Sequence, residues 1–234
     1  MDIKIPYTPR KHQAFLHNKI SKHRWSVLVC HRRFGKTVCM INHLIRSALL
    51  SKQKNPRYAY ISPTFKQSKS IAWDYMKQFT AKIPYTKFNE TELRVDLPNG
   101  SRITLLGSEN SDGLRGIYLD GCVIDEYANV NDKLFPEIIR PALSDRKGYC
   151  VFIGTPQGMN NNFYELYQHA QGAEDWFNYK AKASETKIVD NEELVKAKEV
   201  MGEKKYLQEF EYDWIANIEG SIYNDTLVKM EDQK

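Results

Sequence analysis

The sequence has no run of about 18 apolar residues, which is the length that a membrane-spanning helix needs. Its N-terminal residues also lack the apolar stretch of a secretion signal, so we expect a cytoplasmic protein without a membrane partner. No internal repeat and no low-complexity tract occurs, which argues against solenoid and fibrous proteins. The 234 residues, 41% apolar and 27% charged, suffice for one sizeable α/β domain with a short appendage.

The sequence also lacks the paired cysteines of a zinc site. Its four cysteines form no CxxC pair, and each lies in or beside an apolar run: Cys30, Cys39, Cys122 and Cys150. We therefore predict buried, reduced thiols and no bound zinc.

Acidic residues are scarce in the first half of the chain. Residues 1–117 contain 21 Lys and Arg against 7 Asp and Glu, whereas residues 118–234 contain 13 against 22. A basic half suits a polyanionic partner such as DNA, because phosphates that are neutralised release their counterions. Solvated surface lysine explains the charge equally well when it is taken alone.

Short apolar segments separated by turn residues predict β-strands. They are Ser26–Cys30, Tyr58–Ser62, Arg102–Leu106, Cys122–Asp125, Val151–Gly154 and Phe177–Ala183. The helical pattern over Thr37–Leu50 has one apolar face. Strands that alternate with helices predict a mainly parallel sheet flanked by helices on both sides.

Two further segments shape the expected domain. Asn99 and Gly100 stand between two alternating runs and predict a β-hairpin inserted into the sheet. A charged helical stretch runs from Asn191 to about Phe210. No linker is evident before about residue 216, so we interpret residues 1–215 as one domain and residues 216–234 as a linker or the start of another.

The most specific motif follows the first predicted strand. Residues 30–37 match the phosphate-binding pattern GxxxxGK[ST] except at the first glycine, which is Cys30. Gly35 would let the backbone wrap phosphates, and Lys36 would bring a positive charge to the β- and γ-phosphates. The Thr37 hydroxyl would bind Mg²⁺. A strand before this motif and an amphipathic helix after it make a chance match improbable.

Two arginines occupy this loop, where small residues are usual. Arg32 and Arg33 would lie beside a bound triphosphate and could sense it. An ordinary salt bridge across the fold is an equally good explanation for each of them.

Two carboxylates follow an apolar strand further along the chain. In a phosphate-loop fold, Asp125 at the strand end would hold the Mg²⁺ shell. Glu126 would polarise the attacking water, which is the role of a general base. Two adjacent acids at a strand end are energetically costly because they repel each other. Such a pair is therefore expected where a cation or a reacting water uses it. Together with the phosphate loop, this pair predicts a nucleotide hydrolase.

These features resemble the ATPase domain of the large terminase subunit of tailed bacteriophages, over nearly the whole chain. Tyr7–Gln13 is similar to the adenine-reading motif of that family, and the resemblance implies that Gln13 bonds the base. The segment Asp112–Gly116 is similar to the loop whose arginine, here Arg115, acts as a finger supplied to a neighbouring subunit.

The resemblance extends to the end of another predicted strand. Phe152–Pro156 is similar to the coupling motif of the family, which links the γ-phosphate to movement. It implies that Gly154 and Thr155 have this coupling role here.

The resemblance implies a P-loop NTPase of the additional-strand, catalytic-glutamate type, with ATP and Mg²⁺ as cofactors. Arg32, Arg115 and Glu126 would be catalytic, and Arg33 would bind ATP. The implied function is packaging of double-stranded viral DNA, with a portal protein and a small terminase subunit as partners. The motor would assemble as a homo-oligomeric ring in the host cytoplasm, transiently at the procapsid portal. Family members carry a nuclease domain after the motor, and we expect that site to be absent from this chain, which stops soon after Gly220–Tyr223.

Two alternatives remain at this point. A fragment of a DEAD-like helicase or translocase shares the glutamine motif, the phosphate loop and the Asp-Glu pair, but needs a second motor lobe for which this chain has no room. A non-catalytic nucleic-acid-binding module would explain the basic half. The presence of Lys36, Thr37, Asp125 and Glu126 together argues against such a decayed site.

Overall fold

The computed structural model describes residues 5–109 and 114–215. The segment expected to be a linker, residues 216–234, lies outside the described residues. No helix within the described part is both long and apolar enough to cross a membrane.

Within this part of the chain, eight strands form one sheet in the order β3-β4-β5-β2-β6-β7-β1-β8. Neighbouring strands are parallel except at one edge, where β3 pairs antiparallel with β4 and β4 pairs antiparallel with β5. The strands are β1 (Trp25–Cys30), β2 (Arg57–Ser62), β3 (Lys87–Asn89), β4 (Arg94–Asp96), β5 (Arg102–Gly107), β6 (Gly121–Asp125), β7 (Tyr149–Gly154) and β8 (Trp176–Ala181).

The position of β7 decides the type of sheet. It lies between β1, which leads into the phosphate loop, and β6, which ends in Asp125. Val29 pairs with Gly154, and Asp125 pairs with Ile153. The carboxyl ends of the three parallel strands therefore meet at one edge of the sheet, with an additional strand between the two nucleotide-binding elements.

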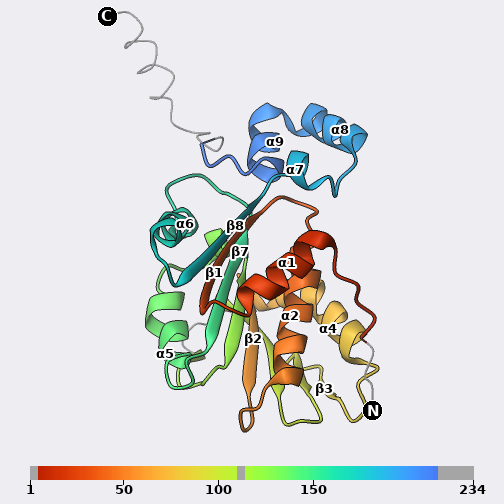
Figure 1. Cartoon of the computed structure of the whole chain (residues 1–234), viewed down its shortest axis with the longest axis vertical. Helices are drawn as coiled ribbons and strands as arrows, with labels where there is room; N and C mark the ends of the chain where they lie inside the picture. Colours follow the sequence, from red (N-terminus) through yellow and green to blue (C-terminus); the bar gives the residue numbers. More distant parts are fainter. Residues whose placement is uncertain (1–4, 110–113, 216–234) are drawn as a thin grey trace, which may run out of the picture.

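Helices cover both faces of the sheet (Figure 1). On one face lie α1 (Lys11–Ile20), α2 (Lys36–Leu50) and α4 (Trp73–Thr80), the last preceded by α3 (Phe65–Gln67) and η1 (Ser68–Ala72). On the other lie α5 (Arg140–Ala142) and α6 (Asn162–Gly172). The short 3₁₀-helix η3 (Tyr127–Asn129) and the short π-helix η4 (Leu134–Ile139) pack in the same core cluster as α6. Three helices gather beyond the end of the sheet: α7 (Ala183–Thr186), α8 (Asn191–Met201) and α9 (Glu203–Phe210).

The core divides into two layers because successive strand residues point to opposite faces. Leu28 packs with Leu44 of α2, whereas Val27 packs on the opposite side in the cluster that contains Phe163 of α6. These strands are buried on both faces, so they are apolar throughout rather than alternating. Burying each of these side chains contributes about 1.5–3 kcal/mol.

Most predicted elements are confirmed, with shifted ends. The hairpin at Asn99 and Gly100 joins β4 and β5 as predicted, but β3 was not foreseen. The last predicted strand ends at Ala181, and Ala183 begins α7 instead. The charged stretch forms two helices because Gly202, with φ 77°, interrupts it. The four cysteines are free and buried, as expected.

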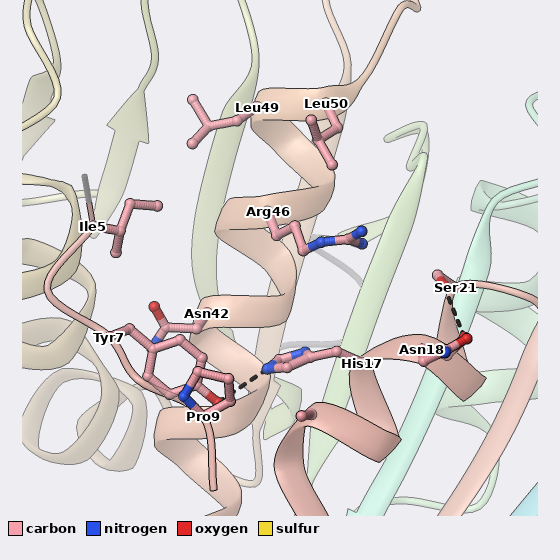
Figure 2. Close-up of a pocket in the computed structure, with 11 residues that line it drawn as sticks. Ile5, Tyr7, Pro9, His17, Asn18, Ser21, Asn42, Arg46, Leu49 and Leu50 are labelled. Atoms are coloured by element: carbon pink, nitrogen blue, oxygen red, sulfur yellow. Dashed lines mark hydrogen bonds between the residues drawn. The ribbon is translucent and has the colours of Figure 1, made fainter. Parts of the chain in front are cut away.

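A pair of histidines, the half-buried His17 and the buried His43, joins α1 to α2. The rings of His17 and His43 stack, with their Nδ1 atoms 3.2 Å apart. Figure 2 shows the bond between His17 Nε2 and the Tyr7 hydroxyl (3.0 Å), beside a cavity of about 670 Å³. Burial lowers the pKa of His17 to about 4 and that of His43 to about 3, and the charge of Arg46 acts in the same direction.

We expect acid to destabilise the protein through this pair. Below pH 6.5 an unfolded chain protonates both histidines, whereas the folded chain keeps them neutral until about pH 4 to 3. Stability is therefore complete above pH 6.5 and falls by up to about 1.4 kcal/mol per pH unit for each histidine below it. Urea unfolding at pH 7, 6 and 5 measures this slope. His17→Gln should flatten it, and the exposed His169→Gln should not; equal slopes would contradict the assignment.

Candidate active site

The phosphate loop connects β1 to α2 through two residues with positive φ, Arg33 and Gly35. Gly35, with φ 85°, precedes the first helical residue, Lys36. A Cβ at this position would lie 3.0 Å from Nε2 of Gln13, so both the backbone angle and the close approach require glycine. The loop therefore ends with free backbone N–H groups at the start of α2, which is an arrangement that binds phosphate.

Lys36 extends from this helix toward the carboxylates that end β6. Its Nζ lies 3.9 Å from Oε1 of Glu126 and 3.5 Å from the carbonyl oxygen of Cys30. Cys30 stands where the motif usually has its first glycine. Its carbonyl oxygen accepts a hydrogen bond from the Lys36 ammonium group. The predicted convergence of the lysine and the acidic pair at one edge of the sheet is confirmed.

Asp125 is held by a donor on each carboxylate oxygen. It is 7% exposed, and its Oδ1 accepts the backbone N–H of Glu126 at 2.9 Å. The hydroxyl of Tyr60 on β2 donates to Oδ2. Burial raises the pKa of Asp125, while the Tyr60 hydrogen bond and the charge of Lys36 lower it.

Glu126 has an unusual backbone for a residue with a side chain. Its φ of 48° and ψ of 48° lie in the left-handed region, which costs about 1–2 kcal/mol outside glycine. Burial raises the pKa of its carboxyl group, and the charge of Lys36 is the strongest influence in the opposite direction. The side chain is still 37% exposed, so a water molecule can reach the carboxylate.

The oxygen groups at this edge fit Mg²⁺. Mg²⁺ is usually bound by one or two carboxylates together with phosphate and water oxygens. Asp125 supplies a carboxylate, whose Oδ2 accepts the Tyr60 hydroxyl, and Thr37 at the start of α2 supplies a hydroxyl. Among the described residues no group of three or more His, Cys, Asp or Glu side chains could hold a metal by itself.

The two loop arginines are exposed at the mouth of a cavity. Arg32 and Arg33 line a space of about 690 Å³ together with residues of α8 and α9. Neither guanidinium forms an ion pair with another residue in the described ranges, so the salt-bridge explanation is not favoured. The charge of Arg32 also lowers the pKa of Glu126, although less than Lys36 does.

Gln13 is hydrogen-bonded to the phosphate loop. It is 4% exposed, its Nε2 donates to the carbonyl oxygen of Gly35 (3.3 Å), and its Oε1 accepts the N–H of Arg10 (3.0 Å). Its place beside the loop agrees with a nucleotide-binding motif, and the adenine contact itself stays a prediction.

The end of β7 lies against the acidic pair. A Cβ on Gly154 would lie 3.2 Å from the ring of Phe163 and 3.6 Å from Cα of Glu126, so glycine permits this close packing. Thr155 follows and is buried, with 6% exposure. Gly154, one of the two predicted coupling residues, thus lies close to the predicted catalytic glutamate.

Helix α9 contacts both loops through consecutive residues. Gln208 is buried, and its Nε2 donates to the carbonyl oxygen of Pro156 at 2.6 Å. The carbonyl oxygen of Glu209 accepts the N–H of Arg32 at 2.8 Å. A segment that the sequence showed only as charged helix therefore bridges the phosphate loop and the residues after β7.

Arg115 lies on a different loop. Its guanidinium forms an ion pair of 3.9 Å with Glu137 of η4, and its side chain is 58% exposed. This exposure leaves it accessible to another molecule. Asp112 and Gly113 of the same predicted motif lie outside the described residues.

Two residues of this region, Tyr60 and Gln208, were not predicted from the sequence. Tyr60 reads as an ordinary core residue of a strand, and Gln208 as a polar residue of a surface helix. Nothing local distinguishes them, because each contact spans a long stretch of chain: Tyr60 to Asp125, and Gln208 to Pro156.

An additional strand between the phosphate-loop strand and the Asp-Glu strand, with a lysine facing both acids, defines a P-loop NTPase of the catalytic-glutamate type. Residues 29–214 match the family model of the T4likevirus-type terminase large subunit, N-terminal. The chain belongs to this terminase family, and the helicase fragment is not favoured.

Individual relatives agree with this family. The large terminase subunits of Thermus phage G20c and Thermus virus P23-45 are both 26% identical over 182 residues, covering 70% of this chain and 36% of theirs. The chain thus spans about a third of the length of these curated relatives.

The solved structures show the same fold. The ATPase domain of the Thermus phage P74-26 large terminase has a TM-score of 0.75 at 20% identity, covering 90% of this chain and 96% of that domain. A large terminase of a thermophilic bacteriophage, solved with ADP, has a TM-score of 0.74 at 15% identity, covering 88% and 53%.

Proposed function

We propose that this chain hydrolyses ATP with Mg²⁺ and uses the energy to move double-stranded DNA into a viral procapsid. The observation that carries the proposal is the convergence of Lys36 with the Asp125 and Glu126 pair at the carboxyl edge of the sheet. Membership of a terminase family, and a relative that was solved with ADP, support a nucleotide as the ligand.

In the proposed reaction, the phosphates lie along the residues that end the phosphate loop. Lys36 leaves its pairing with Glu126 and binds the β- and γ-phosphates, with Arg32 and Arg33 near the γ-phosphate. Thr37 and Asp125 hold Mg²⁺, which neutralises phosphate charge when bound. Glu126 then orients a water molecule for attack on the γ-phosphate.

Arg115 of a neighbouring chain completes this site in our proposal, so that activity requires an assembled ring. Gly154 and Thr155 pass the loss of the γ-phosphate to the rest of the motor. Residues 1–215 form this motor, and residues 216–234 lead into a further part of the protein.

The proposed partners follow from the family and from charge. The basic half of the chain attracts double-stranded DNA. A portal protein and a small terminase subunit would engage the assembled ring in the host cytoplasm, at the procapsid portal.

The direct test is nucleotide binding by the Lys36→Ala variant. Loss of a charge-assisted contact to phosphate should weaken binding of a fluorescent ATP analogue by roughly 10- to 100-fold. The exposed Lys52→Ala variant is the matched control and should bind as the wild type does. Equal affinity in all three proteins, or no binding by the wild type, would refute the proposed site.

A further inference from the structure

A buried tyrosine contacts one of the two groups to which the proposed function assigns the metal. Tyr60 lies on β2, which pairs with β6 so that Tyr60 stands opposite Val123. The side chain is 1% exposed, and its hydroxyl reaches the end of the sheet, where it donates to the carboxylate of Asp125.

This hydroxyl fixes the orientation of the Asp125 carboxylate. The N–H of Glu126 holds Oδ1 at 2.9 Å, and Tyr60 holds Oδ2, so rotation of the carboxylate about its last bond would break both contacts. A buried carboxylate oxygen without a donor is costly, which makes this arrangement strongly preferred.

We propose that Tyr60 is a positioning residue for the divalent cation, through its hydrogen bond to Asp125. The inference rests on the proposed function, because that function makes Asp125 a ligand of Mg²⁺. Hydrogen-bond partners of metal ligands set the direction of the ligand and typically change metal affinity by about 10- to 100-fold. Tyr60 is such a partner of Asp125.

The neighbouring Tyr58 provides a matched control. Tyr58 and Tyr60 are two residues apart on β2, so both point to the face that α2 covers. Tyr58 is 5% exposed, and its hydroxyl donates to the carbonyl oxygen of Ser47, near the far end of α2. Both tyrosines thus have a hydroxyl that donates to an oxygen atom, and of the two only Tyr60 donates to a proposed metal ligand.

The experiment compares Tyr60→Phe with Tyr58→Phe in the whole chain. Affinity for a fluorescent ATPγS is measured in EDTA and over a Mg²⁺ titration, with thermal unfolding as the check on folding. Phenylalanine keeps the ring and its packing, so both variants should fold. For Tyr60→Phe we expect the Mg²⁺ concentration at half effect to rise about 10-fold or more, with unchanged affinity in EDTA. Tyr58→Phe should match the wild type in both measurements.

Three outcomes would overturn the proposal. Equal weakening in EDTA and in Mg²⁺ would mean that Tyr60 supports only the shape of the pocket. A lower Mg²⁺ concentration at half effect in Tyr60→Phe would mean that the Tyr60 hydroxyl competes with the cation. Behaviour identical to that of Tyr58→Phe would mean that it has no role at the metal. Failure of the proposed function is a different result, since the wild type itself would then bind no nucleotide.

Discussion

Glu126→Gln is expected to lower kcat for ATP hydrolysis by about 10²- to 10⁴-fold, which is the usual contribution of a general base. Glutamine keeps the size of the side chain but cannot accept a proton from water. Nucleotide affinity should stay the same or improve, because Lys36 no longer pairs with a carboxylate at 3.9 Å in the empty site.

Phosphate release and equilibrium binding of ATPγS measure the two effects separately. Glu165→Gln removes an exposed carboxylate on α6 and is the control for the general effect of one lost charge. Equal loss of binding and hydrolysis in Glu126→Gln would show that this glutamate supports the pocket rather than the attack on the γ-phosphate.

Under conditions where chains assemble, Arg115→Ala is expected to lower ATP hydrolysis by about 10³- to 10⁵-fold. This loss is larger than the one expected for Glu126→Gln. An arginine finger neutralises charge that develops on the transferred phosphoryl group, and this side chain is 58% exposed. The effect should depend on a second chain. A mixture of Arg115→Ala with Glu126→Gln should therefore regain activity, since one variant supplies the finger and the other the intact glutamate.

Turnover per chain, measured over a range of protein concentrations, tests this dependence in the wild type and in the mixture. Arg140→Ala removes another exposed arginine of the same region and should leave turnover unchanged. A mixture that never exceeds its two components, or wild-type turnover that is independent of concentration, would rule out a finger acting between chains.

The sequence contained enough information for the elements that carry the chemistry. A phosphate-loop motif between an apolar strand and an amphipathic helix allows little alternative, so the position of Lys36 could be predicted. The strand that ends at Asp125 was also predictable, because parallel strands buried on both faces appear as continuous apolar runs.

The remaining features depend on which strands become neighbours. Tyr60 reaches Asp125 only because β2 lies beside β6, and no local pattern encodes that order. The short strand β3 has three residues and little burial, so it leaves no clear periodic signal. The contact of Gln208 with Pro156 likewise joins segments that are distant in the sequence.

The attachment of α9 has a mechanical consequence. Its consecutive residues Gln208 and Glu209 are fastened to Pro156 and Arg32, so a shift of either loop pulls on the same turn of helix. Helix α9 therefore links Pro156 and Arg32, and we expect it to tilt when these two residues move by different amounts. Because α8 packs against α9, we expect a displacement of α9 to be passed on to α8.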